Sequence, residues 1–165
     1  MLLGGARSGK SALAVRLAGE RATFVATGAA EDDEMGERIR RHRAERPSAW
    51  TTIEEPIALG ATLESVDVGE TVVVDCLSLW VSNLLAAGWE DPAVEEESLA
   101  IARRSAARPG STIVVSNEVG LGIVPVNALA RRYRDLLGQV NRTFAGEADR
   151  ALLVVAGRGI ELGRI

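Results

Sequence analysis

The chain has 165 residues, with 19 lysines and arginines against 23 aspartates and glutamates, and this net charge of −4 argues against a general nucleic-acid binder. One cysteine, Cys76, excludes an intrachain disulfide, and one histidine, His42, leaves no zinc site of the usual Cys/His kind. No apolar run approaches the roughly 20 residues of a membrane span, and no signal-peptide core follows the N-terminus, so we expect a cytoplasmic protein.

Short apolar runs alternate along the chain with longer helical patterns. The expected strands are Met1 to Leu3, Thr23 to Ala26, Thr71 to Val74, Thr112 to Val115 and Ala151 to Val155. The expected helices are Lys10 to Glu20, Asp32 to Arg46, Pro56 to Val66, Leu79 to Ala87, Pro92 to Ala107 and Val126 to Ala145. Most of these strands are apolar throughout, which is typical of strands buried on both faces. The alternation predicts an α/β fold with a mainly parallel central sheet, in a single domain over residues 1–165.

The first expected strand leads into a phosphate-binding motif. The pattern G-x-x-x-x-G-K-[ST] is matched by Gly4-Gly5-Ala6-Arg7-Ser8-Gly9-Lys10-Ser11. In such a P-loop, backbone N–H groups turn toward phosphate oxygens and the helix N-terminus adds positive potential. Lys10, the only lysine, would neutralise the β- and γ-phosphates of ATP or GTP, and the Ser11 hydroxyl would hold Mg²⁺. These residues predict a P-loop NTPase-like three-layer fold; the alternative is a glycine-rich turn with a solvated lysine.

The charged segment from Asp32 to Pro47 holds the single histidine among arginines. If this segment is helical, Arg38, His42 and Arg46 share one face at a spacing of four residues. Neighbouring guanidiniums favour a neutral imidazole, which can attack the phosphorus of a bound nucleotide and form a phosphoramidate. The alternative is a solvated charged helix in which His42 has no chemical role.

An aspartate follows the expected strand Thr71 to Val74. P-loop chemistry uses a second carboxylate at the end of a neighbouring hydrophobic strand to hold the metal. We therefore expect Asp75 to hold Mg²⁺ through water. The alternative role is to cap the helix that follows, which is common for an aspartate in this position.

A loop with two glycines follows the expected strand Thr112 to Val115. Asn117 and Glu118 open this loop at the carboxyl end of the strand, where open parallel sheets bind ligands. Glu118 is a candidate base or a group that supports the metal. The alternative is a strand-end turn whose glycines adopt unusual dihedral angles.

Three classes of P-loop protein compete. A GTPase switch needs an N-K-x-D motif to read the base, and a chain whose only lysine is Lys10 has none. Motor and transport ATPases are usually longer and carry remote arginine fingers. The length of 165 residues therefore favours a compact small-molecule kinase, with a non-catalytic nucleotide-binding module as the other hypothesis.

Together these segments resemble one family, the bifunctional adenosylcobinamide kinase / adenosylcobinamide-phosphate guanylyltransferases of cobalamin biosynthesis. The most specific similarity lies in the P-loop, in His42-Arg43 with Arg46-Pro47, and in Asn117-Glu118-Val119-Gly120 with Gly122-Ile123-Val124-Pro125. Shorter matches are Asp32-Asp33-Glu34-Met35, Arg38-Ile39, Trp50, Asp75-Cys76, Trp80, Arg134-Asp135 and Val140-Asn141.

The resemblance implies two reactions. A kinase step moves the γ-phosphate of ATP or GTP to the aminopropanol hydroxyl of adenosylcobinamide. A transferase step then moves GMP from GTP onto that phosphate through a guanylylated histidine, which maps onto His42. The implied nucleotide-binding residues are Gly4, Gly5, Ala6, Arg7, Ser8, Gly9, Lys10, Ser11, Thr27, Gly28, Ala29, Arg43, Ala44, Glu45, Arg46, Glu54 and Asp75. The resemblance also implies a homotrimer, and the alternative function is a monofunctional small-molecule kinase.

Overall fold

A computed structural model describes residues 1–28 and 47–165. The strands are β1 (Leu2–Leu3), β2 (Thr23–Ala26), β3 (Thr51–Glu54), β4 (Val72–Asp75), β5 (Thr112–Val115), β6 (Leu152–Val155) and β7 (Arg158–Glu161). The helices are α1 (Lys10–Ala18), α3 (Leu59–Ser65), α4 (Leu77–Ala86), α5 (Asp91–Ala107) and α6 (Ala128–Glu147). The helix predicted from Asp32 to Arg46 lies outside the described residues.

The strands form one sheet in the order β3-β2-β4-β5-β1-β6-β7. Its pairings are parallel except that of β7, which runs antiparallel to β6. Ala26 lies opposite both Glu54 and Asp75, and Asp75 lies opposite Val115, so these strands end at one level. The predicted α/β fold with a mainly parallel sheet is confirmed, and its carboxyl edge gathers several predicted site residues.

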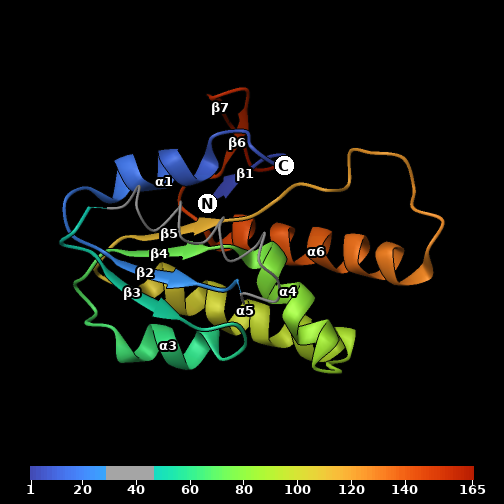
Figure 1. Ribbon diagram of the computed structural model, residues 1–165, viewed down its shortest axis with the longest axis horizontal. Helices are drawn as coiled ribbons and strands as arrows, with labels where there is room; N and C mark the ends of the chain where they lie inside the picture. The colour runs from blue at the N-terminus through green and yellow to red at the C-terminus, as the bar shows by residue number, and fades with distance from the viewer. Residues whose placement is uncertain (29–46) are drawn as a thin grey trace.

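Alternate residues of the central strands pack on opposite faces of the sheet. In β4, Val72 and Val74 join the core formed with α3, α4, α5 and α6, whereas Val73 joins the core on the side of α1. All three valines are at most 1% exposed, as expected for a strand covered on both faces. Figure 1 shows α1 above the sheet and the other helices of the described residues below it, which confirms the three-layer arrangement.

Two strands of the sheet were not predicted. β3 lies at one edge, and its sequence Thr-Thr-Ile-Glu is only partly buried. β7 lies at the other edge and is exposed along its whole length. Because an edge strand needs no continuous apolar run, neither segment carries the pattern that identifies a buried strand.

Two helices begin later than their patterns predict. α3 begins at Leu59 and not at Pro56, because the Glu55 carboxylate accepts two backbone N–H groups of the preceding turn, at 2.7 and 2.8 Å. α6 begins after Asn127 and not at Val126, because the Asn127 side chain accepts an N–H of the first turn at 3.1 Å. Within the described parts of the chain, no helix is both long and apolar enough to cross a membrane.

Candidate active site

Residues Gly4 to Ser11 form a tight loop between β1 and the first turn of α1. Gly4 has a φ of 151°, a region that side chains with a Cβ rarely adopt. A Cβ on Gly4 would also overlap the carbonyl oxygen of Val154 in β6, so only glycine fits there. Gly9, with a φ of 102°, is the residue from which α1 starts. The two glycines of the motif therefore shape the loop.

Lys10 is held inside this loop and is 7% exposed. Its ammonium donates hydrogen bonds to the carbonyl oxygens of Gly4 at 2.8 Å and Gly5 at 2.6 Å. Its charge therefore lies among the backbone groups that would surround a phosphate, as the motif predicts.

Two neighbouring segments hold the loop in place. The backbone N–H of Glu118, just after β5, donates to the carbonyl of Gly4 at 3.1 Å. The N–H of Gly157, in the turn between β6 and β7, donates to the carbonyl of Ser8 at 2.8 Å. Sequence reasoning missed the role of Gly157, although a glycine that follows an apolar run marks a turn.

Asp75 is the last residue of β4 and is half-buried at the carboxyl edge. It pairs with Val115, which in turn pairs with Leu2, so only β5 separates β4 from the strand before the phosphate loop. At two strand spacings, the two strands lie about 10 Å apart. The alternative that Asp75 caps α4 is wrong, because the residue at the cap is Cys76 and no side chain makes a cap hydrogen bond.

Ser11 and Asp75 supply the oxygen atoms that suit Mg²⁺. Ser11 is the second residue of α1 and is half-buried. Within residues 1–28 and 47–165, no side chain donates to the Asp75 carboxylate, and no three carboxylate, imidazole or thiol groups cluster. A hydroxyl and one carboxylate fit a cation that keeps water and phosphate oxygens in its other positions.

Thr27 follows β2 and is fully buried. Its hydroxyl donates to the carbonyl of Cys76 at 2.7 Å and accepts the N–H of Cys76 at 2.8 Å. Its carbonyl accepts the side-chain amide of Asn83 at 2.7 Å. These contacts join the ends of β2 and β4. The next residue, Gly28, lies close to α4, where an added Cβ would be 3.2 Å from a methyl group of Leu79.

We expect Thr27→Val to lower the free energy of unfolding by about 2 kcal/mol, because it leaves the buried N–H of Cys76 without a partner and leaves the Cys76 carbonyl with only the N–H of Trp80. Chemical denaturation followed by circular dichroism would measure the change. Thr112→Val is the matched control, since the buried Thr112 hydroxyl has no hydrogen-bond partner among the described residues. Equal destabilisation by both substitutions would contradict this role for the Thr27 hydroxyl.

Glu54 is the exposed last residue of β3. It pairs with Ala26, so β2 lies between Glu54 and Asp75 along the carboxyl edge. The sheet thus brings Glu54, Asp75 and the phosphate loop to one edge. Six other predicted site residues lie outside the described residues: Ala29, His42, Arg43, Ala44, Glu45 and Arg46.

A polar network lies next to Asp75. The Cys76 thiol contacts the Ser78 hydroxyl at 2.9 Å, and the Asn117 amide donates to that hydroxyl at 2.9 Å. The Asn141 amide donates to the Asn117 carbonyl at 3.0 Å, and the Ser116 hydroxyl donates to the Asn141 side-chain oxygen at 2.6 Å. The network fixes the start of the loop after β5 and was not predicted.

Burial raises the pKa of the Cys76 thiol, and the neighbouring Asp75 carboxylate raises it further. The thiol is therefore protonated at neutral pH and is no candidate nucleophile. Burial also raises the pKa of Tyr133 to about 12. Its hydroxyl donates to the carbonyl of Ser78 at 3.0 Å, so Tyr133 contributes a neutral hydrogen bond to the network.

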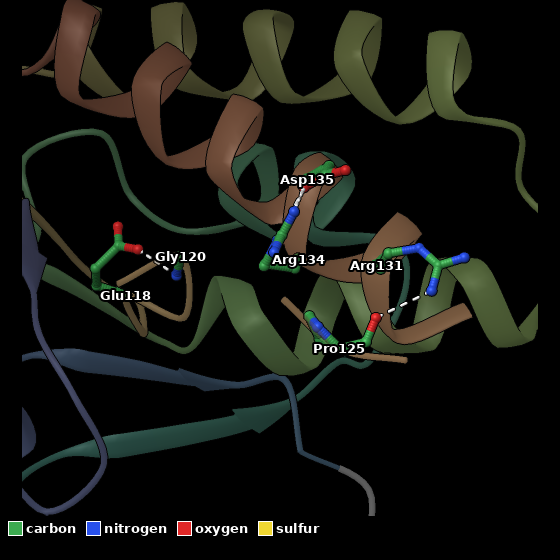
Figure 2. Close-up of polar contacts among 6 residues, drawn as sticks. All are labelled: Glu118, Gly120, Pro125, Arg131, Arg134 and Asp135. Carbon is green, nitrogen blue, oxygen red and sulfur yellow. Dashed lines mark hydrogen bonds and ion pairs between the residues drawn. The ribbon is translucent and has the colours of Figure 1, made fainter. Parts of the chain in front are cut away.

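Glu118 makes two different contacts. Its carboxylate accepts the N–H of Gly120 at 2.5 Å and closes a turn (Figure 2), whereas its backbone N–H binds Gly4. The strand-end turn considered for this segment is therefore present. A role for Glu118 as a base stays a prediction.

The mainly parallel sheet between two helical layers, with a glycine-shaped loop after β1 and a carboxylate at the end of β4, defines an α/β protein of P-loop NTPase-like fold. A family model described as cobinamide kinase / cobinamide phosphate guanyltransferase matches residues 1–162. The chain belongs to this family, and the resemblance found in the sequence is confirmed.

Three curated proteins are similar over nearly the whole chain. The bifunctional adenosylcobalamin biosynthesis protein CobP of Pseudomonas aeruginosa is 48% identical over 162 residues, which cover 95% of this chain and 92% of that protein. The bifunctional adenosylcobalamin biosynthesis protein CobU is 38% identical over 178 residues in Salmonella typhimurium. The CobU of Escherichia coli is 36% identical over 177 residues. Each CobU match covers 98% of both chains.

Proposed function

We propose that this chain carries both activities in the description of its family. It phosphorylates adenosylcobinamide with ATP or GTP and transfers GMP from GTP to adenosylcobinamide phosphate, giving adenosylcobinamide-GDP. The observation that supports the proposal best is the buried Lys10 ammonium inside a glycine-shaped loop, at the same sheet edge as Asp75. The similarity to bifunctional relatives over nearly the full length supports the pairing of the two reactions.

In the kinase step, the loop from Gly4 to Ser11 binds the phosphates through backbone N–H groups. Lys10 neutralises the charge that develops on the transferred phosphoryl group. Ser11 and, through water, Asp75 would hold Mg²⁺, which would add positive charge beside the phosphates. The acceptor is the aminopropanol hydroxyl of adenosylcobinamide.

In the transferase step, a neutral His42 nitrogen attacks the α-phosphorus of GTP. A P–N bond forms, the bond to the bridging oxygen breaks, and pyrophosphate leaves. A phosphate oxygen of adenosylcobinamide phosphate then attacks the same phosphorus and releases the imidazole. Thr27, Gly28 and Glu54 position the nucleotide, as do the residues from Arg43 to Arg46 and Ala29.

The proposal is tested by incubating the protein with adenosylcobinamide, ATP, GTP and Mg²⁺ and identifying corrinoid products by chromatography and mass spectrometry. We expect adenosylcobinamide phosphate first and adenosylcobinamide-GDP second. A monofunctional kinase would stop at the phosphate. A nucleotide-binding module would bind GTP saturably and change no corrinoid. Either of these results would contradict the proposed function.

We expect Asp75→Asn to raise the Mg²⁺ concentration for half-maximal kinase activity by roughly tenfold, because the amide lacks the negative charge that attracts the cation. A Mg²⁺ titration at fixed ATP would measure the shift. Asp149→Asn is the matched control, since Asp149 is exposed and precedes β6 at the opposite edge of the sheet. An unchanged Mg²⁺ dependence in Asp75→Asn would contradict the metal role of Asp75.

The proposal also includes a homotrimer, which the resemblance implies, and a cytoplasmic location, which the sequence led us to expect. With a chain mass of 17.5 kDa, light scattering coupled to size-exclusion chromatography would distinguish a trimer from a monomer or dimer. A monomeric mass for the active enzyme would contradict this part.

A further inference from the structure

The chain from just after β5 to the first turn of α6 presents an unusual surface. We call residues 119–129 the apolar arm. Its most exposed side chains are Leu121, Ile123 and Val126, at 84%, 97% and 99% exposure. Val119, Val124 and Leu129 are exposed as well, and no residue from Val119 to Ala130 is charged. Figure 1 shows this segment as a long loop that extends away from the body of the protein. Such a surface is costly in water, so a ligand or partner is expected to cover it.

Hydrogen bonds hold both ends of the apolar arm (Figure 2). At the near end, Glu118 binds the N–H of Gly120 through its carboxylate. At the far end, the Arg131 guanidinium donates to the carbonyls of Pro125 at 3.0 Å and Val126 at 2.6 Å. The charged groups beside the arm thus bind its backbone, and its apolar side chains face outward.

The apolar arm begins at the phosphate loop. The backbone N–H of Glu118 binds the carbonyl of Gly4, the first residue of that loop, and Ser116 binds Leu2 of β1 at 2.9 Å. The acceptor must place its hydroxyl at the γ-phosphate. Because the rest of the acceptor is large, it must extend outward from this edge of the sheet. Among the described residues, the arm is an exposed apolar surface that begins at this edge.

We propose that the apolar arm is the docking surface for the corrin ring of adenosylcobinamide; this inference rests on the proposed function. A corrin ring has an apolar, methyl-bearing framework with neutral amide side chains at its edge. Apolar side chains separated by glycines, with backbone amides between them and no charge, match that chemistry. The phosphate loop binds the nucleotide, and the arm binds the part of the acceptor that lies away from the reacting hydroxyl.

A second copy of the chain is the competing occupant. A stable protein–protein interface uses roughly 20–30 residues on each side, with aromatic residues and arginine enriched at its centre. The uncharged segment from Val119 to Ala130 is shorter than that and contains no aromatic residue. Its extent and composition fit a large neutral ligand better than a subunit interface.

The test is steady-state kinetics of the full-length enzyme carrying both Leu121→Ser and Ile123→Ser. We expect the KM for adenosylcobinamide to rise by about tenfold or more, because two apolar contacts are lost. The KM for the nucleotide and the labelling of the protein by GTP without corrinoid should stay within about twofold. The matched control combines Val68→Ser and Ile160→Ser, which are 61% and 60% exposed and lie outside the arm. It should leave every parameter unchanged.

Arg131→Met provides an independent variant, because it removes the two hydrogen bonds at the far end and leaves the apolar side chains in place. We expect it to raise the same KM without changing the nucleotide KM. If the arm variants keep the wild-type KM for adenosylcobinamide, or lose corrinoid affinity only together with a fall in oligomeric mass, the inference is overturned. If the wild-type enzyme itself changes no corrinoid, the proposed function has failed instead.

Discussion

Replacement of His42 by asparagine is expected to abolish the protein-bound GMP that the wild-type chain acquires from α-labelled GTP. Asparagine keeps a side-chain hydrogen-bonding group but has no nucleophilic nitrogen, so no P–N bond forms. Phosphorylation of adenosylcobinamide should stay within about twofold of the wild type, because the kinase step uses the phosphate loop. The measurement is the amount of acid-labile, base-stable label that stays with the protein after gel filtration has removed free nucleotide.

The composition of the chain makes this experiment unusually clear. His42 is the only histidine, and Lys10 carries the only side-chain amine; each could form an acid-labile bond between phosphorus and nitrogen, whereas the arginine guanidiniums stay protonated and are poor nucleophiles. Label that persists in His42→Asn and disappears in Lys10→Met would assign the intermediate to the lysine and contradict the histidine mechanism. Burial raises the pKa of the Cys76 thiol, so this side chain stays protonated and is a poor nucleophile.

Lys10→Met is expected to reduce the rate of γ-phosphate transfer by roughly 10³-fold, equivalent to about 4 kcal/mol of transition-state stabilisation. Methionine retains an unbranched side chain of similar length but has no charge and cannot donate to the carbonyls of Gly4 and Gly5. Transfer of γ-label from ATP to adenosylcobinamide, at saturating nucleotide, measures the change.

The matched control for the lysine is Arg16→Met, which also replaces a cation by methionine on α1 but at an exposed position nearer the end of the helix. It should leave the rate unchanged, since exposed surface charges contribute little. Equal losses in both variants would show a general electrostatic effect of α1, and a fully active Lys10→Met would remove the lysine from the mechanism.

The interior of the fold could be predicted because its strands are apolar on both faces. The runs of apolar residues in β2 and β4 are enough to predict these two strands. The glycine-lysine pattern in turn predicts the phosphate loop after β1. The sequence also predicted that Asp75 would lie at the carboxyl edge. These features depend on local sequence patterns, which can be recognised without knowing which strands are neighbours.

The two edge strands of the sheet, and the hydrogen bonds that hold the phosphate loop in place, could not be predicted in the same way. β3 and β7 are strands because β2 and β6 offer them backbone hydrogen bonds, and such pairing leaves little trace in an exposed segment. The bond from Gly157 to Ser8 joins residues far apart in the sequence. No local pattern specifies a contact of that kind.

One residue of the polar network beside Asp75 could have been recognised in the sequence. Asn141 is 4% exposed and lies on α6 between the buried Val140 and Phe144, where a polar residue needs a partner. The pattern indicates a buried hydrogen bond, but only the fold identifies its partners as Asn117 and Ser116. The arrangement of the segment that contains His42 was predicted from charge spacing alone and lies outside the described residues.

The central claim is that one chain forms a guanylylated intermediate and passes it to the corrinoid. The most direct measurement is a chase, in which protein labelled by α-labelled GTP is freed of nucleotide and mixed with adenosylcobinamide phosphate. The account predicts that label leaves the protein and appears in adenosylcobinamide-GDP in equal amount. Label that stays on the protein, or leaves it only as free GMP while adenosylcobinamide-GDP forms unlabelled from added GTP, would contradict the account.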